Sequence, residues 1–251
     1  MSAQVMAGAD AFAIDAGPSG VLLLHGFTGN PASMRVVGAW LAERGHSVSA
    51  PRYPGHGTRW QDLADTTWED WAGEAERALE DLAGRTDGLV VLGQSMGGAM
   101  ALHLAANRAD VVRGVALVNP YVLDRRIAPA FLLSPVLRSW KGVGGDIKKA
   151  QADELAYPRI PMRAIAQLAA FLKVVRRELR QVRQPLILFR SVQDHVVPKG
   201  SAEFILERVG STKKELVELP NSYHVACLDH DAELIAERTD AFARVLATAT
   251  G

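Results

Sequence analysis

A single serine lies among glycines in the stretch GQSMGG, residues 93–98, directly after an apolar run. The pattern Gly-x-Ser-x-Gly, here Gly93, Ser95 and Gly97, is typical of a nucleophile elbow when it joins a strand to a helix. The residues two before and two after such a serine approach other backbone so closely that a Cβ atom would clash. The stretch therefore predicts a serine nucleophile. A close-packed glycine turn with an incidental serine is the alternative.

Two later loops provide the acid and the base that a serine nucleophile requires. Asp194 follows the apolar run PLILFRS, residues 185–191, and His224 follows KELVELP, residues 214–220. The chain order serine, acid, histidine is the order expected when the nucleophile stands on such an elbow. We therefore predict that Ser95, Asp194 and His224 form a catalytic triad.

Other residues compete for these roles. Asp124 follows the apolar run of residues 114–120, which precedes PLILFRS along the chain, and is the alternative acid to Asp194. His195 is expected to structure its loop, and His230 to be solvated or to cap a helix. His25 and His56 also lie in loops near the site, and both are expected to be structural.

An oxyanion hole requires two backbone N–H groups directed at the tetrahedral oxygen. Met96, the residue after the nucleophile, would supply one of them. The loop HGFTG, residues 25–29, follows an apolar run and would supply the other from Phe27. Gly26 and Gly29 would let this loop fold back toward the nucleophile.

Short runs of valine, isoleucine and leucine, bounded by glycine or proline, predict parallel strands covered on both faces. They are residues 20–26, 46–51, 88–93, 114–120, 185–191 and 214–220. Thr66 and Glu69 stand in capping-box register at the start of one intervening helix, and the residues up to Gly17 are a candidate edge strand. The alternation predicts an open, mostly parallel α/β sheet with helices on both faces.

The alternation is interrupted between Asn119 and Pro185, where we find no convincing strand. A helical insertion there would lie over the carboxyl edge of the sheet, where such folds bind ligands, so we expect a cap over residues 120–184. Its last helix has one apolar face, formed by Met162, Ile165, Leu168, Leu172, Val175 and Leu179. Part of this helix is alternatively an ordinary crossover packed on the sheet.

Composition narrows the class of protein. The 251 residues include 28 basic and 28 acidic side chains and are 48% hydrophobic, which favours one domain and argues against nucleic acid as a partner. We find neither a secretory signal nor a membrane-spanning run, and expect a cytoplasmic protein. Cys227 is expected to be an inert core thiol. No metal or organic cofactor is implied, and the oligomeric state is not indicated.

These residues together resemble the α/β-hydrolases, more narrowly the bacterial monoacylglycerol lipases and related carboxylesterases. The likeness lies in LLLHGFTGNPASMR, GHGTRWQDL, GQSMGG, DELAY, DHVVP and NSYHVACLDHD, which follow the family's order over residues 20–240. It implies an α/β-hydrolase fold with a small helical cap inserted after the sixth strand, and the site roles given above. It also implies that Glu154, in DELAY, helps hold the glycerol hydroxyls. A buried salt bridge or an exposed face is an alternative role for this carboxylate.

The reaction implied is the hydrolysis of carboxylic esters, most of all monoacylglycerols, to glycerol and free fatty acid through an acyl-enzyme on Ser95. A general short- or medium-chain carboxylesterase or thioesterase is the alternative, followed by a non-catalytic homologue that binds a small molecule. The apolar cap predicts that an acyl chain lies beneath it. The last cap helix, with five basic residues between Lys173 and Arg183, is a candidate for transient contact with a membrane surface, although a solvated face is the simpler interpretation.

Overall fold

The computed structural model describes residues 4–124, 126–127, 129–134, 137–142, 144–198 and 200–248. Within these ranges, seven strands form one sheet in the order β1-β3-β2-β4-β5-β8-β9. The strands are β1 (Phe12–Ile14), β2 (Ser19–Leu24), β3 (His46–Ala50), β4 (Gly88–Gln94), β5 (Val112–Val118), β8 (Leu186–Ser191) and β9 (Lys214–Leu219). Strand β1 pairs with β3 in antiparallel fashion, and the other pairs are parallel. The six predicted strands and the N-terminal edge strand are therefore confirmed.

The central strands are apolar at consecutive positions because both of their faces are covered. In β2, Leu22 and Leu24 pack in the core on one side of the sheet. Val21 and Leu23 pack in a second core on the other side. Strand β2 therefore contributes to two separate cores.

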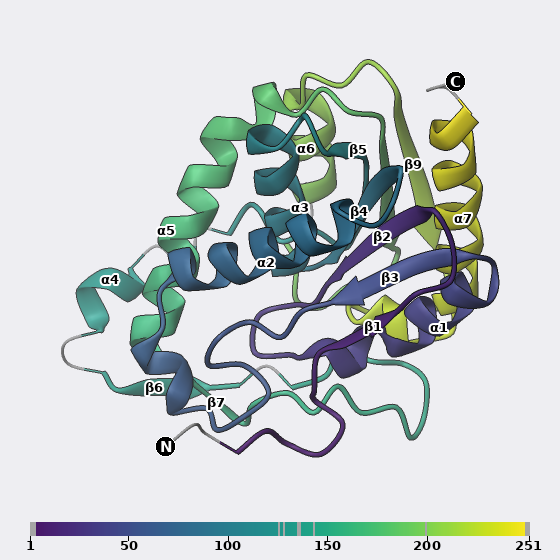
Figure 1. Cartoon of the computed structure of the whole chain (residues 1–251). Coiled ribbons are helices and arrows are strands. Elements are labelled where there is room, and N and C mark those ends of the chain that lie inside the picture. The colour runs from purple at the N-terminus through teal and green to yellow at the C-terminus, as the bar shows by residue number, and fades with distance from the viewer. Residues whose placement is uncertain are drawn as a thin grey trace.

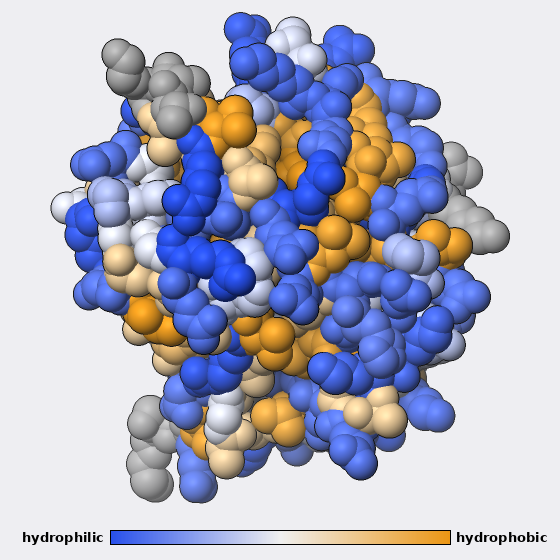
Figure 2. Space-filling model, turned by 90° about the vertical axis from the view of Figure 1, so that its right-hand side faces the viewer, coloured by the Kyte–Doolittle hydropathy of each residue, from blue (hydrophilic) through white to orange (hydrophobic). Residues whose placement is uncertain are grey.

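Helices cover both faces of the sheet (Figure 1). Helices α1 (Arg35–Glu43) and α7 (Ala232–Thr248) pack on one face, and α2 (Trp68–Ala83), α3 (Met96–Asn107), α5 (Met162–Glu178) and α6 (Ser201–Arg208) pack on the other. Figure 2 shows the molecule from the side of α7, where hydrophilic side chains predominate and apolar ones are exposed in patches between them. Among the described residues, no helix combines the length and apolar composition needed to cross a bilayer.

Helix α2 begins one residue later than predicted. Thr67, not Thr66, is the N-cap: the Thr67 N–H donates to Asp70 Oδ2 at 2.8 Å, and Asp70 N–H donates to Thr67 Oγ1 at 3.3 Å. The hydroxyl of Thr66 is already engaged, because it donates to the Leu63 carbonyl and accepts from Trp71 Nε1. The predicted capping pair of Thr66 and Glu69 is therefore wrong by one residue.

The insertion between β5 and β8 contains α4 (Ala130–Leu133), β6 (Ser139–Lys141), β7 (Arg159–Pro161), α5 and a 3-10 turn, η3 (Leu179–Gln181). The expectation that it lacks strands is wrong, because β6 and β7 pair in antiparallel fashion with Trp140 opposite Ile160. The insertion also follows the fifth strand of the sheet rather than the sixth, since only one short strand precedes β2 among the described residues.

Helix α5 is largely a crossover helix, as the alternative interpretation held. Leu168, Phe171, Leu172 and Val175 are buried in the same core as α3. Their three- and four-residue spacing places them on one helix face. The part of the insertion over the strand ends is therefore mainly the segment before α5. There, Asn30 Nδ2 donates to the Glu154 carbonyl at 3.1 Å.

Candidate active site

Ser95 stands at the sharp turn between β4 and α3. Its backbone dihedrals, φ 58° and ψ −118°, lie in a region that L-residues occupy only when the surrounding structure imposes it. Backbone hydrogen bonds impose it here: Ser95 N–H donates to the Val118 carbonyl at 2.9 Å, and the Ser95 carbonyl accepts from the N–H groups of Gly98 and Tyr121, both at 3.0 Å. The turn has the geometry of the predicted nucleophile elbow.

The glycines of the elbow are required by close backbone contacts. A Cβ atom on Gly97 would lie 2.0 Å from the Leu24 carbonyl oxygen, and one on Gly93 would lie 2.0 Å from the carbonyl oxygen of Gly97. The helix can therefore approach the sheet this closely only without side chains at these positions. This confirms the steric prediction made from the motif.

The structure brings Ser95, Asp194 and His224 together from three separate loops. His224 Nε2 lies 2.9 Å from Ser95 Oγ, and His224 Nδ1 lies 2.9 Å from Asp194 Oδ2. An ionised carboxylate only accepts hydrogen bonds, so Nδ1 carries the proton and Nε2 is left to accept from the serine hydroxyl. The hydroxyl can therefore lose its proton to the imidazole as it attacks.

Asp194 is held as a carboxylate although it is largely buried. Burial raises its pKa, but the hydrogen bond and charge of His224 and the N–H groups of Val196 and Val197 outweigh this, so the pKa lies below its usual value. Both of those N–H groups donate to Oδ1 at 2.8 Å. The other oxygen, Oδ2, is thereby left to orient the imidazole.

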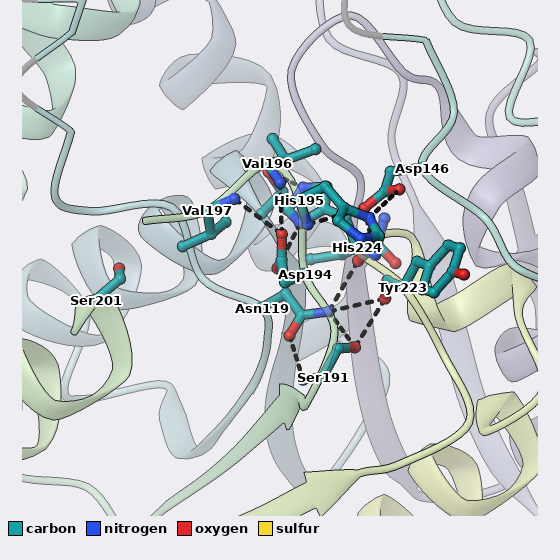
Figure 3. A network of polar contacts seen from close by, with 12 residues as sticks. Asn119, Asp146, Ser191, Asp194, His195, Val196, Val197, Ser201, Tyr223 and His224 are labelled. Carbon is teal, nitrogen blue, oxygen red and sulfur yellow. Dashed lines mark hydrogen bonds and ion pairs between the residues drawn. The ribbon is translucent and has the colours of Figure 1, made fainter. Parts of the chain in front are cut away.

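Asn119, at the end of β5, ties the loops of the site to the sheet (Figure 3). Its Nδ2 donates to the His224 carbonyl at 2.9 Å and to Ser191 Oγ at 2.8 Å, and its Oδ1 accepts from Ser191 N–H at 2.7 Å. Asn119 also has a positive φ of 45°. In the sequence, the only signal for a role of this residue is its place at the end of a predicted strand.

Asp124, the alternative acid, makes other contacts. Arg126 Nε lies within 3.0 Å of both carboxylate oxygens, and the Tyr121 hydroxyl donates to Oδ2 at 2.6 Å. Burial raises the pKa of Asp124, but the hydrogen bonds from Arg126 and Tyr121 hold it below its usual value. The carboxylate oriented toward His224 is that of Asp194.

Four further histidines near the site have the surroundings that the sequence predicts. His195, in the loop after β8, has its Nδ1 2.8 Å from Oδ1 of Asp146, which lies in the insertion. His230 is exposed. His25 and His56 are fully buried, with their rings 5.3 Å apart. Burial lowers the pKa of His56 to about 4, so this imidazole is neutral at neutral pH.

The predicted oxyanion donors lie on the two segments that flank Ser95. Gly26 packs directly against the serine, since a Cβ atom there would lie 3.3 Å from Ser95 Cβ. Gly29 N–H donates to the Gly26 carbonyl at 3.2 Å and closes a tight turn around Phe27. Met96 begins α3 directly after the serine. Both segments that carry the predicted donors therefore lie next to Ser95.

Glu154 reaches the site from the insertion. Its side chain is buried, and a Cβ atom on Gly29 would lie 2.6 Å from Glu154 Oε1. Burial raises the pKa of Glu154 to about 7, although the charge of His224 acts in the opposite direction. The alternative of an exposed face for this residue is therefore wrong.

The buried thiol of Cys227 and the arrangement of possible metal-binding side chains bear on what the site could bind. Cys227 is buried, its N–H donates to Gln94 Oε1 at 3.1 Å, and burial raises the pKa of its thiol, which fits an inert core cysteine. In the described part of the chain, no group of three or more His, Cys, Asp or Glu side chains is arranged to hold a metal ion.

Comparison with known proteins gives consistent matches. The family model described as serine aminopeptidase, S33, matches residues 18–231. The chain is 40% identical to a thermostable monoacylglycerol lipase of Bacillus sp. (strain H-257), over 94% of each chain. It is 28% identical to a carboxylesterase of Bacillus subtilis (strain 168), over 89% of this chain and 92% of the esterase. A solved structure from a study of LipS and LipT, two metagenome-derived lipolytic enzymes, has a TM-score of 0.92 and 39% identity, and covers 96% of this chain and 99% of its own.

Proposed function

Because the chain belongs to the α/β-hydrolase family described as serine aminopeptidase, S33, we propose that Ser95, His224 and Asp194 carry out its ester hydrolysis. The observation that carries the assignment is the pair of 2.9 Å contacts from the two nitrogens of His224 to Ser95 and Asp194. Ser95 is the nucleophile, His224 the general base and acid, and Asp194 the group that orients the imidazole.

The proposed reaction has two halves. His224 Nε2 accepts the Ser95 hydroxyl proton while Oγ attacks the ester carbonyl carbon. When the tetrahedral intermediate collapses, the bond between the carbonyl carbon and the alcohol oxygen breaks, and the alcohol leaves with the proton from Nε2. The acyl group remains bound to Ser95 Oγ. A water molecule then gives a proton to His224 and attacks the acyl carbon, and Ser95 regains its proton as the acid departs.

The N–H groups of Phe27 and Met96 stabilise the oxyanion in this scheme. Support comes from the contact of Gly26 with Ser95 and from the start of α3 directly behind the serine. N–H groups at the start of a helix have no intrahelical partner and lie at the positive end of the helix dipole. Preorganised donors of this kind contribute about 3 kcal/mol each to catalysis.

We infer that the preferred substrates are monoacylglycerols, with Glu154 binding a hydroxyl of the glycerol. The relative that is 40% identical is named a monoacylglycerol lipase, and Glu154 is a buried carboxyl beside the loop that carries Phe27. A buried polar group with few partners binds a matching hydroxyl strongly, because leaving it unpaired costs about 1–3 kcal/mol. A general carboxylesterase is the second candidate, favoured by the Bacillus subtilis relative.

We propose that the chain forms a single hydrolase domain, that the part of the insertion before α5 forms its cap, and that this cap touches lipid surfaces transiently. The basic residues of the sequence predict this contact for α5, but Arg176 of that helix is half-buried and donates to the Val122 carbonyl. Among the cap residues that the structure describes, the large apolar side chains that are exposed lie instead near α4 and β6, and they are Leu132, Leu133, Leu137 and Trp140. Sedimentation with anionic vesicles should show binding that Trp140→Ser together with Leu132→Ser weakens.

The function is tested with a panel of monoacylglycerols and p-nitrophenyl esters of increasing acyl length, together with leucine p-nitroanilide. We expect hydrolysis of the esters, preference for monoacylglycerols, and loss of nearly all turnover in Ser95→Ala. A fluorophosphonate should label the wild-type protein stoichiometrically and leave Ser95→Ala unlabelled. Substantial turnover by Ser95→Ala would overturn the site assignment, and faster cleavage of the anilide would overturn the ester assignment.

A further inference from the structure

Asp146, in the insertion between β5 and β8, contacts the two loops that carry Asp194 and His224. Its Oδ2 accepts from the N–H groups of His195 and His224, at 3.1 and 3.2 Å, and its Oδ1 lies 2.8 Å from His195 Nδ1. Its own carbonyl accepts from Val225 N–H at 3.1 Å. One side chain thus joins the residue after Asp194 to the backbone of His224 (Figure 3).

The loop that carries His224 lies between β9 and α7, at residues 220–231, and is called the base loop here. It also binds this part of the insertion. Asp229, 1% exposed, accepts from the N–H groups of Lys148 and Lys149 at 2.7 and 2.9 Å. It also accepts from Tyr223 N–H at 2.9 Å. These backbone donors hold the pKa of Asp229 below its usual value, although burial acts in the opposite direction. Residues 146–149 are therefore attached to the base loop by two carboxylates.

We propose that Asp146 is a positioning residue, which sets the geometry between Asp194 and His224 from the cap. The proposal rests on the proposed function of this site. Asp194 and His224 belong to loops that follow different strands, so their relative position depends on contacts between the loops. Asn119 Nδ2 donates to the backbone carbonyl of His224, and Asp146 Oδ2 accepts from the backbone N–H of the same residue.

The contact matters because the catalytic hydrogen bonds tolerate little displacement. Asp146 is 15% exposed, so its loss would leave two N–H groups of the loops without a protein acceptor at a largely enclosed position. The loops would then be free to separate, and the imidazole would lose its alignment. A displacement of about 1 Å from a residue outside the chemistry lowers turnover by up to about a hundredfold.

The experiment compares Asp146→Asn with Asp146→Ala and Asp146→Leu. The amide oxygen of asparagine can accept from both backbone N–H groups, while its NH₂ group donates to Nδ1 of a neutral His195, so this variant should retain kcat within about threefold. Alanine and leucine offer no acceptor, and we expect kcat to fall by about ten- to a hundredfold with KM little changed. Leucine keeps most of the side-chain volume, so it provides a folded test if alanine destabilises the chain.

A second readout is independent of catalysis. Amide hydrogen exchange at His195 and His224 should accelerate in Asp146→Ala and Asp146→Leu and stay near wild type in Asp146→Asn. Asp81→Ala, which removes an exposed carboxylate from α2, is the control for loss of charge. Unchanged exchange and kcat in both apolar variants would overturn the proposal, as would an asparagine variant as impaired as alanine. If no ester is cleaved by the wild type, the proposed function fails, and exchange still tests the positioning role.

Discussion

His224 Nε2 lies 2.9 Å from Ser95 Oγ, although 129 residues separate the two in the chain. The contact depends on the imidazole tautomer, because Nε2 accepts from the hydroxyl only when the ring proton is on Nδ1. Asp194 selects that tautomer through its 2.9 Å contact with Nδ1. The ability of His224 to accept a hydrogen bond from Ser95 therefore depends on a carboxylate that does not touch the serine.

Asp194→Asn should retain the fold and lose most of the activity. The amide oxygen of asparagine can still accept from Val196 and Val197 N–H, but its NH₂ group would face His224 Nδ1 and favour the tautomer with the proton on Nε2. We expect kcat to fall by about 10⁴-fold, the loss known for the equivalent change in a serine protease. Steady-state kinetics with a p-nitrophenyl ester, together with thermal unfolding, measure both effects. An activity within tenfold of wild type would contradict this role.

Asp124→Asn should have the opposite profile. The carboxylate of Asp124 binds Arg126 and Tyr121, so its loss should lower the melting temperature and leave kcat within about threefold. The cost in unfolding free energy should be about 1–3 kcal/mol, the range for disrupting a buried hydrogen-bonded group. Measurement in parallel with Asp194→Asn separates the two acids. A larger activity loss in Asp124→Asn than in Asp194→Asn would make Asp124 the orienting acid.

Gly97→Ala should destabilise the chain and abolish the elbow. A Cβ atom there would lie 2.0 Å from the Leu24 carbonyl oxygen, and this backbone can move only with β2. We expect a loss of about 3 kcal/mol in unfolding free energy, at the upper end for overpacking. Gly73→Ala is the matched control: it lies within α2, its Cβ would meet its nearest neighbour at 3.6 Å, and it should stabilise by about 0.5–1 kcal/mol. Equal effects of the two changes on urea unfolding would refute the steric argument.

Glu154 should make the stability of the chain depend on pH. Burial raises its pKa from 4.5 to about 7, so between these pH values the folded chain binds a proton that the unfolded chain has released. The free energy of unfolding contributed by this group therefore falls as pH rises through that window. Glu154→Gln does not ionise, and its stability relative to wild type should increase by up to about 3 kcal/mol from about pH 4 to about pH 8. Urea unfolding of both proteins at the two pH values measures it; a constant difference would show an unshifted carboxyl.

Local patterns in the sequence were sufficient to predict the strands of the seven-stranded sheet, the elbow and the order of the three site residues. The runs in β2, β4 and β5 predict buried parallel strands because both faces of such strands must be apolar. The glycines at 93 and 97 predict the elbow because a steric requirement acts over a few residues. Where two neighbouring residues satisfy the same local rule, the pattern does not separate them, so the sequence predicts Thr66 as the N-cap although Thr67 occupies that position.

The tertiary structure decided which polar groups meet. The hydrogen bond from Asn119 to the His224 carbonyl and the approach of Asp146 from the insertion to His224 depend on contacts between segments that lie far apart in the chain. Hydrogen bonds of this kind require partners within about 3 Å and near-linear geometry, and residue type and spacing do not specify such positions across distant segments. The short β6–β7 pair is not predictable from the sequence for the same reason, because its pairing joins segments on opposite sides of a long loop.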